Sequence, residues 1–167
     1  MGMLAGELLR LELPQSNKRL FVFVETDGCF ADGVSVASGC TLGHRTLRLM
    51  DYGKVAATFV DTETETSLRI WPHPGARTRA LDYMPDAKTH WHAQLDAYQI
   101  MPYDELYRWQ PVKLTVPLKQ IISRPGIRVS CAHCGEEILN GREVVIDGET
   151  LCLSCSGEHY FQAAVTV

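Results

Sequence analysis

The stretch CAHCGEEILNGREVVIDGETLCLSC, residues 131–155, decides the fold of the last part of this chain. It holds two Cys-x2-Cys pairs, Cys131 with Cys134 and Cys152 with Cys155, and 17 residues separate the pairs. Zinc sites have this spacing, because a tetrahedral ion needs four thiolate sulfurs at about 2.3 Å and each pair supplies two of them. The four cysteines therefore predict a bound Zn2+.

The residues between the two pairs favour a single metal ion. Asp147-Gly148 stands between two short apolar runs, which predicts a β-hairpin, and Gly135 suits a tight turn after Cys134. Disulfides and an iron–sulfur cluster are alternative uses of four cysteines, but the hairpin favours a mononuclear site. Because four sulfur ligands leave no open coordination position, we predict one structural zinc ion per chain.

The charge of this segment argues against a nucleic-acid partner. From Arg128 to Cys155 there are two arginines and five acidic residues, a net charge of −3, and zinc on four thiolates adds about −2. Binding to phosphates requires several cations on one face. The whole chain has a net charge of −4 and a pI near 5.8. A protein-binding or dimerising role is the more plausible one.

The preceding residues predict an α+β domain, a mixed sheet with flanking helices. The sequence Ser-Arg-Pro-Gly at 123–126 resembles a linker, so we expect a core domain at 1–127 and a zinc-ribbon or treble-clef-like module with a tail at 128–167. The last strand should lie at a sheet edge, because Pro117 has no N–H to donate. Helices are expected at 3–13, 29–38, 76–84, 87–101 and 103–109, and strands at 18–26, 45–51, 54–61, 67–71 and 112–118.

The composition predicts a cytoplasmic protein. No run of about 18 apolar residues is present, so we expect no membrane span. The first 13 residues carry Glu7 and Arg10 within their apolar stretch, which is typical of an amphipathic helix and not of a signal peptide. In a reducing compartment cysteines bind metals or react more often than they form disulfides.

Several stretches taken together resemble the FmdE family, named after the E subunit of formylmethanofuran dehydrogenase, in the version with a C-terminal zinc ribbon. They are VETDGC (24–29), SGCTLG (38–43), DYGKVAATF (51–59), WHAQLDAYQIMP (91–102) and ISRPGIRVSCAHCGEEI (122–138). The resemblance implies an α+β core followed by a zinc module, a homodimer, and association with a molybdenum or tungsten oxidoreductase whose pterin and iron–sulfur chemistry belongs to other subunits.

One departure from the family pattern concerns the N-terminus. Family members carry H-G-H-x-C-P-G just before a helix, whereas this chain begins MGMLAGELL, with Gly2 and Gly6 aligned to the end of that motif and the start of the helix. We expect either that the start of the protein lies upstream of Met1 or that part of the core-domain site has been lost.

Cys29 is the first candidate for a site in the core domain. It falls in the first turn of the helix expected at 29–38, where the helix dipole stabilises a thiolate. Cys40 lies past the other end of that helix, about 15 Å away, so the two sulfurs cannot share one ion. The resemblance implies that both cysteines line a cleft. Asp27, as the expected N-cap, and His44 are further candidates to reach it. The alternative is that both cysteines are small buried hydrophobic residues.

Three functions are consistent with these features. The first is a zinc-binding accessory or metal-handling protein of a molybdenum- or tungsten-type oxidoreductase system. The second is a metal-dependent enzyme with a second metal in a cleft at Cys29. The third, a zinc-ribbon transcriptional regulator, is disfavoured by the acidic ribbon. The sequence contains no phosphate-binding loop, no G-x-S-x-G and no H-E-x-x-H, so it shows no complete catalytic constellation.

Overall fold

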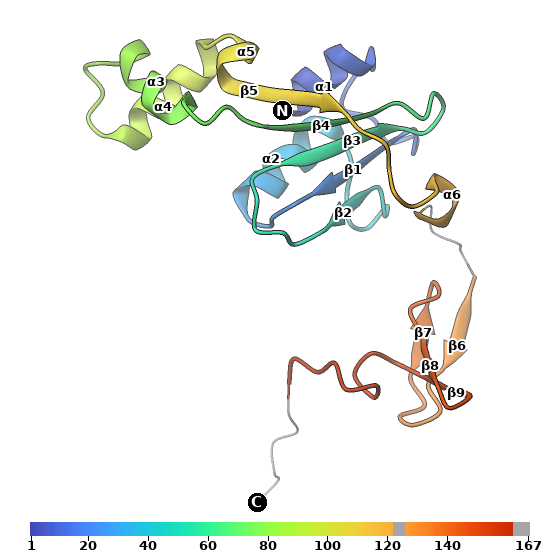
Figure 1. Ribbon diagram of the computed structural model, residues 1–167. Helices are drawn as coiled ribbons and strands as arrows, with labels where there is room; N and C mark the ends of the chain where they lie inside the picture. The colour runs from blue at the N-terminus through green and yellow to red at the C-terminus, as the bar shows by residue number, and fades with distance from the viewer. Residues whose placement is uncertain (122–125, 162–167) are drawn as a thin grey trace, which may run out of the picture. The chain divides into compact units, whose positions relative to one another are not determined.

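The computed structural model of this protein describes residues 1–121 and 126–161 (Figure 1). The chain divides into two compact units, Met1–Lys119 and Gln120–Val167, and each is described by itself. The domain boundary expected between residues 127 and 128 stays a prediction. Residues 123–125 of the expected linker lie outside the described part of the chain.

The first unit is built on a five-stranded mixed sheet in the order β2-β1-β3-β4-β5. The strand β1 pairs in parallel with β2 and antiparallel with β3, and the pairs β3–β4 and β4–β5 are antiparallel. The α+β class expected from the sequence is therefore confirmed. The strands are β1 (Leu20–Val24), β2 (Leu47–Leu49), β3 (Ala57–Asp61), β4 (Ser67–Pro72) and β5 (Tyr107–Pro111).

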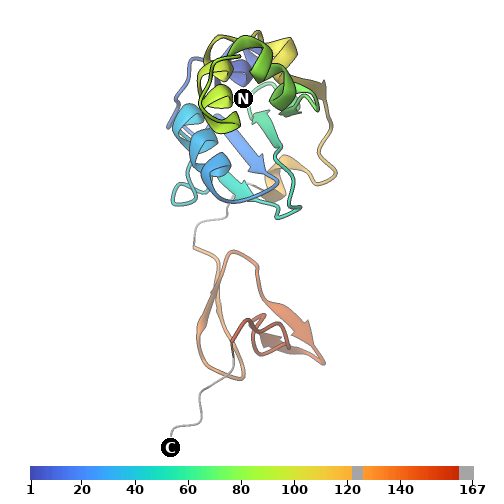
Figure 2. The ribbon, with the colours of Figure 1, turned by 90° about the vertical axis from the view of Figure 1, so that its left-hand side faces the viewer.

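Five of the six helices in the described ranges fall into two groups around this sheet. The first two helices pack against each other. The next three lie together at the end of the sheet where β4 finishes and β5 begins (Figures 1 and 2). The helices are α1 (Gly2–Leu9), α2 (Cys29–Ser38), α3 (Ala76–Tyr83), α4 (His90–Ile100), α5 (Tyr103–Leu106) and α6 (Leu118–Ile121). None of the helices in the described ranges has the length and apolar composition that a bilayer crossing requires.

The main hydrophobic core lies between the sheet and the first two helices. Alternate residues of β1 (Leu20, Val22 and Val24) point into it, because successive side chains of a strand face opposite sides of the sheet. Phe59 of β3 is fully buried in the same core. Burying each of these side chains contributes about 1.5–3 kcal/mol, so this contact holds α1 and α2 on the sheet.

Two bidentate ion pairs join the residues on either side of β1 to β3 and β4. Arg19 donates to both carboxylate oxygens of the buried Asp61, at 3.0 and 2.8 Å. Arg69 donates in the same way to Glu25, at 2.6 and 2.8 Å. The Arg19 hydrogen bonds lower the pKa of Asp61 to about 2, so this carboxyl group stays charged at neutral pH.

The strands expected at 45–51 and 54–61 are separated in the sequence by only Tyr52 and Gly53, which predicts a tight connection between them, and this prediction is wrong. These strands, β2 and β3, do not pair, because β1 lies between them. The segment that joins them passes the end of β1, where Met50 N–H donates to Val24 O and Tyr52 N–H donates to Glu25 O. A parallel strand on one side and an antiparallel strand on the other can both complete the hydrogen bonds of β1.

Helix α1 is shorter than expected. The sequence predicts a helix that runs to Leu13, but α1 ends at Leu9 and Arg10 takes a left-handed conformation with φ 56°. The N–H of Leu11 bonds to Gly6 O and the N–H of Arg10 bonds to Glu7 O, which is the Schellman pattern of helix termination. This turn leads Leu11 back into the hydrophobic core.

The expected capping of α2 by Asp27 is also wrong. Helix α2 spans Cys29–Ser38 as predicted, but Gly28 is its N-cap and no side chain accepts a hydrogen bond there. Gly28 has φ 74° and ψ −162°, a conformation that is essentially restricted to glycine. The chain therefore enters the helix by a sharp backbone turn that leaves the Asp27 side chain out of the cap.

Two expected elements near the end of the first unit differ from the structure. The helix expected at 103–109 stops at Leu106, and Tyr107–Pro111 instead forms β5, which pairs with β4. Residues 112–117 of the strand expected at 112–118 form no strand, and α6 begins at Leu118. Pairing with an available sheet edge outweighs the helical preference of residues 107–109.

The described residues of the second unit form two small hairpins. β6 (Arg128–Ser130) pairs with β7 (Glu137–Leu139), and β8 (Val144–Ile146) pairs with β9 (Glu149–Leu151). The turn between β8 and β9 has positive φ at both Asp147 and Gly148, as a type I′ turn requires, so this predicted hairpin is confirmed. The sequence interpretation did not include the first hairpin.

Candidate functional site

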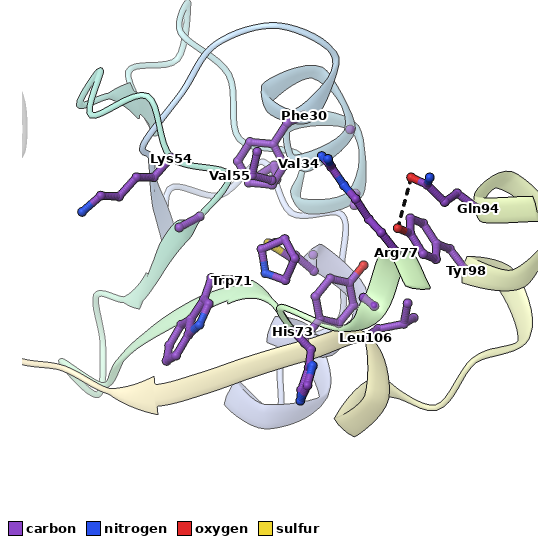
Figure 3. A pocket seen from close by; sticks show the side chains of 18 of the residues that line it. Phe30, Val34, Lys54, Val55, Trp71, His73, Arg77, Gln94, Tyr98 and Leu106 are labelled. Carbon is purple, nitrogen blue, oxygen red and sulfur yellow. Dashed lines mark hydrogen bonds between the residues drawn. The ribbon is translucent and has the colours of Figure 1, made fainter. Parts of the chain in front are cut away.

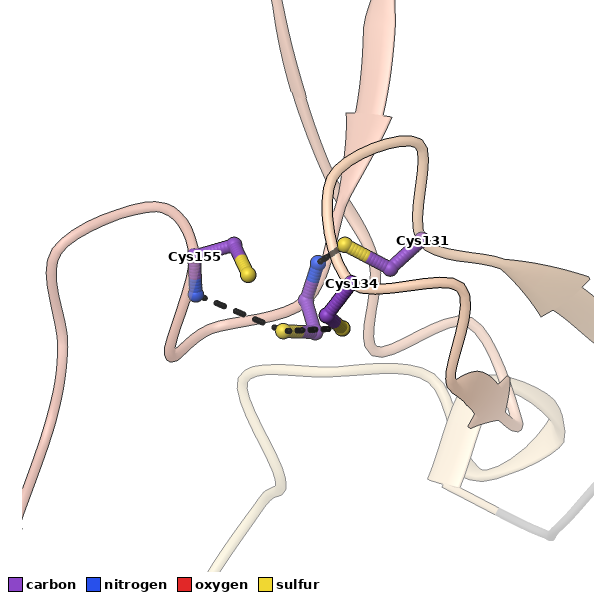
Figure 4. A group of neighbouring side chains, drawn as sticks. Cys131, Cys134 and Cys155 are labelled. Carbon is purple, nitrogen blue, oxygen red and sulfur yellow. Dashed lines mark hydrogen bonds between the residues drawn. The ribbon is translucent and has the colours of Figure 1, made fainter. Parts of the chain in front are cut away.

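The four cysteines of the second unit gather in one cluster. The Sγ atoms of Cys131, Cys134, Cys152 and Cys155 all lie within 4.8 Å of one another. Cys131 and Cys134 stand in the turn between β6 and β7, and Cys152 directly follows β9. Figure 4 shows the labelled thiols turned toward a common centre. Two hairpins thus present one Cys-x2-Cys pair each.

The distances in this cluster fit a zinc ion. Four sulfurs at about 2.3 Å from a tetrahedral ion would stand about 3.8 Å from one another. The Sγ atoms of Cys134 and Cys152 are 3.9 Å apart. All four thiols are free, so the cluster contains no disulfide. The donor set and its spacing therefore support a zinc site, as the sequence predicts.

Hydrogen bonds and charge repulsion also prepare the cluster for a cation. The backbone N–H of Cys152 donates to Cys131 Sγ and that of Cys155 donates to Cys152 Sγ, both at 3.3 Å. Backbone N–H groups of Cys134 and Cys152 lower the pKa of Cys131 to about 6, whereas the hydrogen bond with Cys152 raises the pKa of Cys155 to about 12. Neighbouring thiolates repel one another, so the four thiols do not all lose their protons on their own. A divalent cation balances the negative charge and allows all four to deprotonate.

A second candidate site lies in the first unit, as a cleft of about 880 Å³. Its walls come from the first residues of α1, from α2, from the segment before β3, from β4 and the turn after it, and from α3 and α4. Figure 3 shows Phe30 and Val34 of α2 on one side and Trp71 of β4 on another. The size suits a small organic molecule.

The charges that line the cleft are all positive. Lys54, Arg69 and Arg77 line it, whereas none of the described residues that line it is an aspartate or glutamate. Arg69 is neutralised by Glu25 and lies 5.2 Å from the ring centre of Trp71. The side chains of Lys54 and Arg77 are in no salt bridge with the described residues.

The structure separates the four candidate residues of the core domain. Cys29 is exposed and lines the cleft, at the first turn of α2. Cys40 is buried in the hydrophobic core, where its thiol donates to Leu20 O at 3.2 Å and burial raises its pKa. Asp27 and His44 are exposed and do not line the cleft. Within the described ranges, Cys29 joins no cluster of three potential metal ligands.

Other cleft residues were missed by the sequence interpretation. Trp71, Arg77 and Tyr98 lie on β4, α3 and α4 respectively and converge only in the tertiary structure. Tyr98 donates to Gln94 at 3.3 Å, and burial raises its pKa while the nearby Arg77 opposes the shift. On α4 the aromatic residues Trp91 and Tyr98 are exposed, whereas the small residues Ala93 and Ala97 are buried. This spacing of aromatic and small residues is the one signal in the sequence that could have indicated the exposed face of α4.

The sequence matches the models of two known families. The FmdE family, described as "FmdE, Molybdenum formylmethanofuran dehydrogenase operon", matches residues 1–114. The family described as "Prokaryotic dksA/traR C4-type zinc finger" matches residues 126–161, which include all four clustered cysteines.

Individual proteins are similar to this chain as well. The crystal structure of a tungsten formylmethanofuran dehydrogenase FmdE-like protein from Syntrophus aciditrophicus has 22% identity and a TM-score of 0.58, covering 90% of this chain and 78% of that one. A probable S-adenosyl-L-methionine-binding protein of Archaeoglobus fulgidus is 28% identical over 180 residues, 96% of this chain and 48% of that protein. The chain thus spans about half the length of this curated relative.

Proposed function

This chain belongs to the FmdE family, and we propose that it is a zinc-binding accessory protein of a molybdenum- or tungsten-type oxidoreductase system. In this proposal the zinc ion is held by the four cysteines of the second unit and has a structural role. The cleft of the first unit binds a small organic ligand that the accessory protein delivers or senses. A homodimer, contacts with subunits of the oxidoreductase and a cytoplasmic location belong to the same proposal.

The cleft is the observation that carries a binding role. It is a concave site of about 880 Å³ that combines apolar and aromatic walls with a small number of polar groups, as ligand sites do. The family description and the name of the Syntrophus aciditrophicus protein both refer to formylmethanofuran dehydrogenase, which supports the link to a molybdenum or tungsten enzyme. The name of the Archaeoglobus fulgidus relative adds S-adenosyl-L-methionine to the ligands worth testing.

A metal-dependent enzyme is the second candidate function. The observation that favours it is the exposed thiol of Cys29, which stands in the cleft at the N-terminal turn of a helix. In that case a second metal ion would bind there. Among the described residues, Cys29 belongs to no group of three potential metal ligands. The other ligands of that second ion would therefore have to come from elsewhere.

Two measurements test the proposal. The tagged protein is purified from the organism that carries its gene, and zinc, molybdenum and tungsten are quantified together with the co-purifying polypeptides. We expect one zinc ion per chain and molybdenum or tungsten in proportion to a co-purifying oxidoreductase. Purification without either of those metals would contradict the accessory role.

The variant Cys29→Ala separates the two candidate functions. The accessory role predicts an unchanged zinc content, because Cys29 is outside the four-cysteine cluster. A fall from two metal ions per chain to one would support the enzyme instead.

A further inference from the structure

We propose that the cleft of the first unit recognises a small organic anion that carries a flat ring, with Arg77 as the group that binds the negative charge. The proposal deepens the binding role given above and rests on it. Four independent features of the cleft support it: its charge, its walls, the helix ends that meet there, and a glycine within one helix.

The charge of the cleft selects an anion. Of its lining cations, Arg69 is already held by the two carboxylate oxygens of the buried Glu25. Arg77 is exposed and is in no salt bridge with the described residues. A guanidinium offers paired donors to a carboxylate or phosphate, and no lining carboxylate among the described residues competes for them. For the same reason, a cationic group of a ligand would find no carboxylate partner among the described lining residues.

Arg77 and Lys54 lie at different places in the cleft and therefore have different roles in binding an anion. Figure 3 shows Arg77 extending from α3 in the direction of α2, where Phe30 and Val34 stand, whereas Lys54 points outward from the rim. Arg77 can therefore hold a group within the cleft. Lys54 adds attraction at the entrance, where solvent screens its charge.

The walls of the cleft suit a ring. Phe30 lines one side and Tyr98 lines another, and Val34 and Val55 supply apolar contacts between them. Aromatic side chains stack on flat ligands, and this stacking adds to the gain from burying apolar area. The Tyr98 hydroxyl is engaged by Gln94, which holds the ring in place. The combination of a cation and aromatic walls favours a charged group attached to a ring.

Two helices begin at the cleft, and neither is capped by a side chain. Cys29 and Phe30 in the first turn of α2, and Ala76 and Arg77 in the first turn of α3, all line it. The N-cap residue of each helix is a glycine, and no side chain of the described residues caps either helix, although the Ala76 N–H donates to the backbone oxygen of His73. The partial positive charge at the start of α3 adds to that of Arg77, whereas Asp32 in the first turn of α2 offsets the charge of the other helix end.

Gly33 leaves a bare stretch of backbone in the cleft wall. A glycine within a helix destabilises the helix relative to alanine. Nothing in the described part of the protein requires this residue, because a Cβ at position 33 would meet no atom within 4 Å. Gly33 is exposed and lines the cleft. The space that a methyl group would occupy is therefore available to a ligand.

The test compares three probes by isothermal titration calorimetry: AMP, adenosine and ribose 5-phosphate. AMP carries a ring and an anion, adenosine lacks the anion, and ribose 5-phosphate lacks the ring. We expect AMP to bind at least about tenfold more tightly than either of the others, since a hydrogen bond to a charged group is worth a factor of ten or more. Adenosine binding as tightly as AMP, or no binding of AMP at millimolar concentration, would overturn the proposal. The oxidoreductase association tested above does not depend on this result.

Arg77→Gln should weaken AMP binding about tenfold. Arg142→Gln is the matched control, because it makes the same change at an exposed position of the second unit and should leave AMP binding unchanged. Equal effects of the two variants would show that Arg77 does not bind the anion.

Gly33→Ala gives a readout that a merely structural role would not produce. It should raise the midpoint of thermal unfolding by roughly 3–6 °C and weaken AMP binding about fivefold or more. The control Val36→Ala changes a 79% exposed residue of the same helix that does not line the cleft. Val36→Ala should leave AMP binding unchanged, and a stabilised Gly33→Ala protein with unchanged affinity would contradict the role of Gly33.

Discussion

Removal of the metal should unfold the second unit and leave the first unit folded. The perturbation is a strong chelator, or the variant Cys152→Ser, which removes one of the four clustered sulfurs. The two units are compact by themselves, and the cysteine cluster belongs to the second one. The loss of structure should therefore stop near the boundary between them.

The buried residues of the second unit give the magnitude of the effect. Within residues 126–161, the buried hydrophobic side chains are Cys131 and Ile138. Burying Ile138 contributes about 3 kcal/mol. Binding of zinc to a four-ligand site of this kind contributes about 10–16 kcal/mol at neutral pH. The contribution of the metal is the larger by a wide margin, so the hairpins cannot remain folded on hydrophobic burial alone.

Hydrogen exchange read by mass spectrometry resolves the two units in one experiment. After chelation we expect amides of residues 128–151 to exchange fully, while amides of β1 and β3 stay protected. Zinc measured by elemental analysis should fall from one per chain to zero in Cys152→Ser. Cys29→Ser is the control and should retain both zinc and protection, since its thiol lies outside the cluster. A metal-free protein whose second unit stays protected would refute the reasoning.

Two further predictions concern the first unit. The pKa of Asp61 is lowered to about 2 by Arg19, so its contribution of about 2 kcal/mol to the free energy of unfolding is complete above pH 4 and is lost as the pH falls from 4 to 2. In urea titrations Asp61→Asn should be less stable than the wild type at pH 6, with a gap that closes near pH 2; a constant gap would contradict this origin. Gly39→Ala should destabilise the protein by roughly 2 kcal/mol or more from backbone strain and overpacking, because Gly39 has φ 77° and a Cβ there would stand 2.5 Å from the backbone oxygen of Gln15. Unfolding midpoints that match the wild type would contradict that clash.

Local patterns in the sequence predicted the elements whose stability is local. The limits of α2, the Asp147-Gly148 turn and the convergence of two Cys-x2-Cys pairs follow from residues close together in the chain. The predictions failed where a distant partner decided the outcome. Residues 107–109 have a helical pattern but form part of β5, because the edge of β4 offers them backbone hydrogen bonds.

The features of the candidate sites also separate into those that follow from local sequence and those that depend on distant contacts. The sequence by itself determined the metal-binding cluster, because the ligand spacing and the hairpin together bring four sulfurs to one point. It also marked Cys29, since the position of a residue in a helix is a local property. Only the tertiary structure decided that Cys40 is buried, that Arg77, Phe30 and Tyr98 meet in one cleft, and that β1 lies between β2 and β3. These contacts join segments tens of residues apart, and their free energies come from burial and strand pairing that no short stretch of sequence contains.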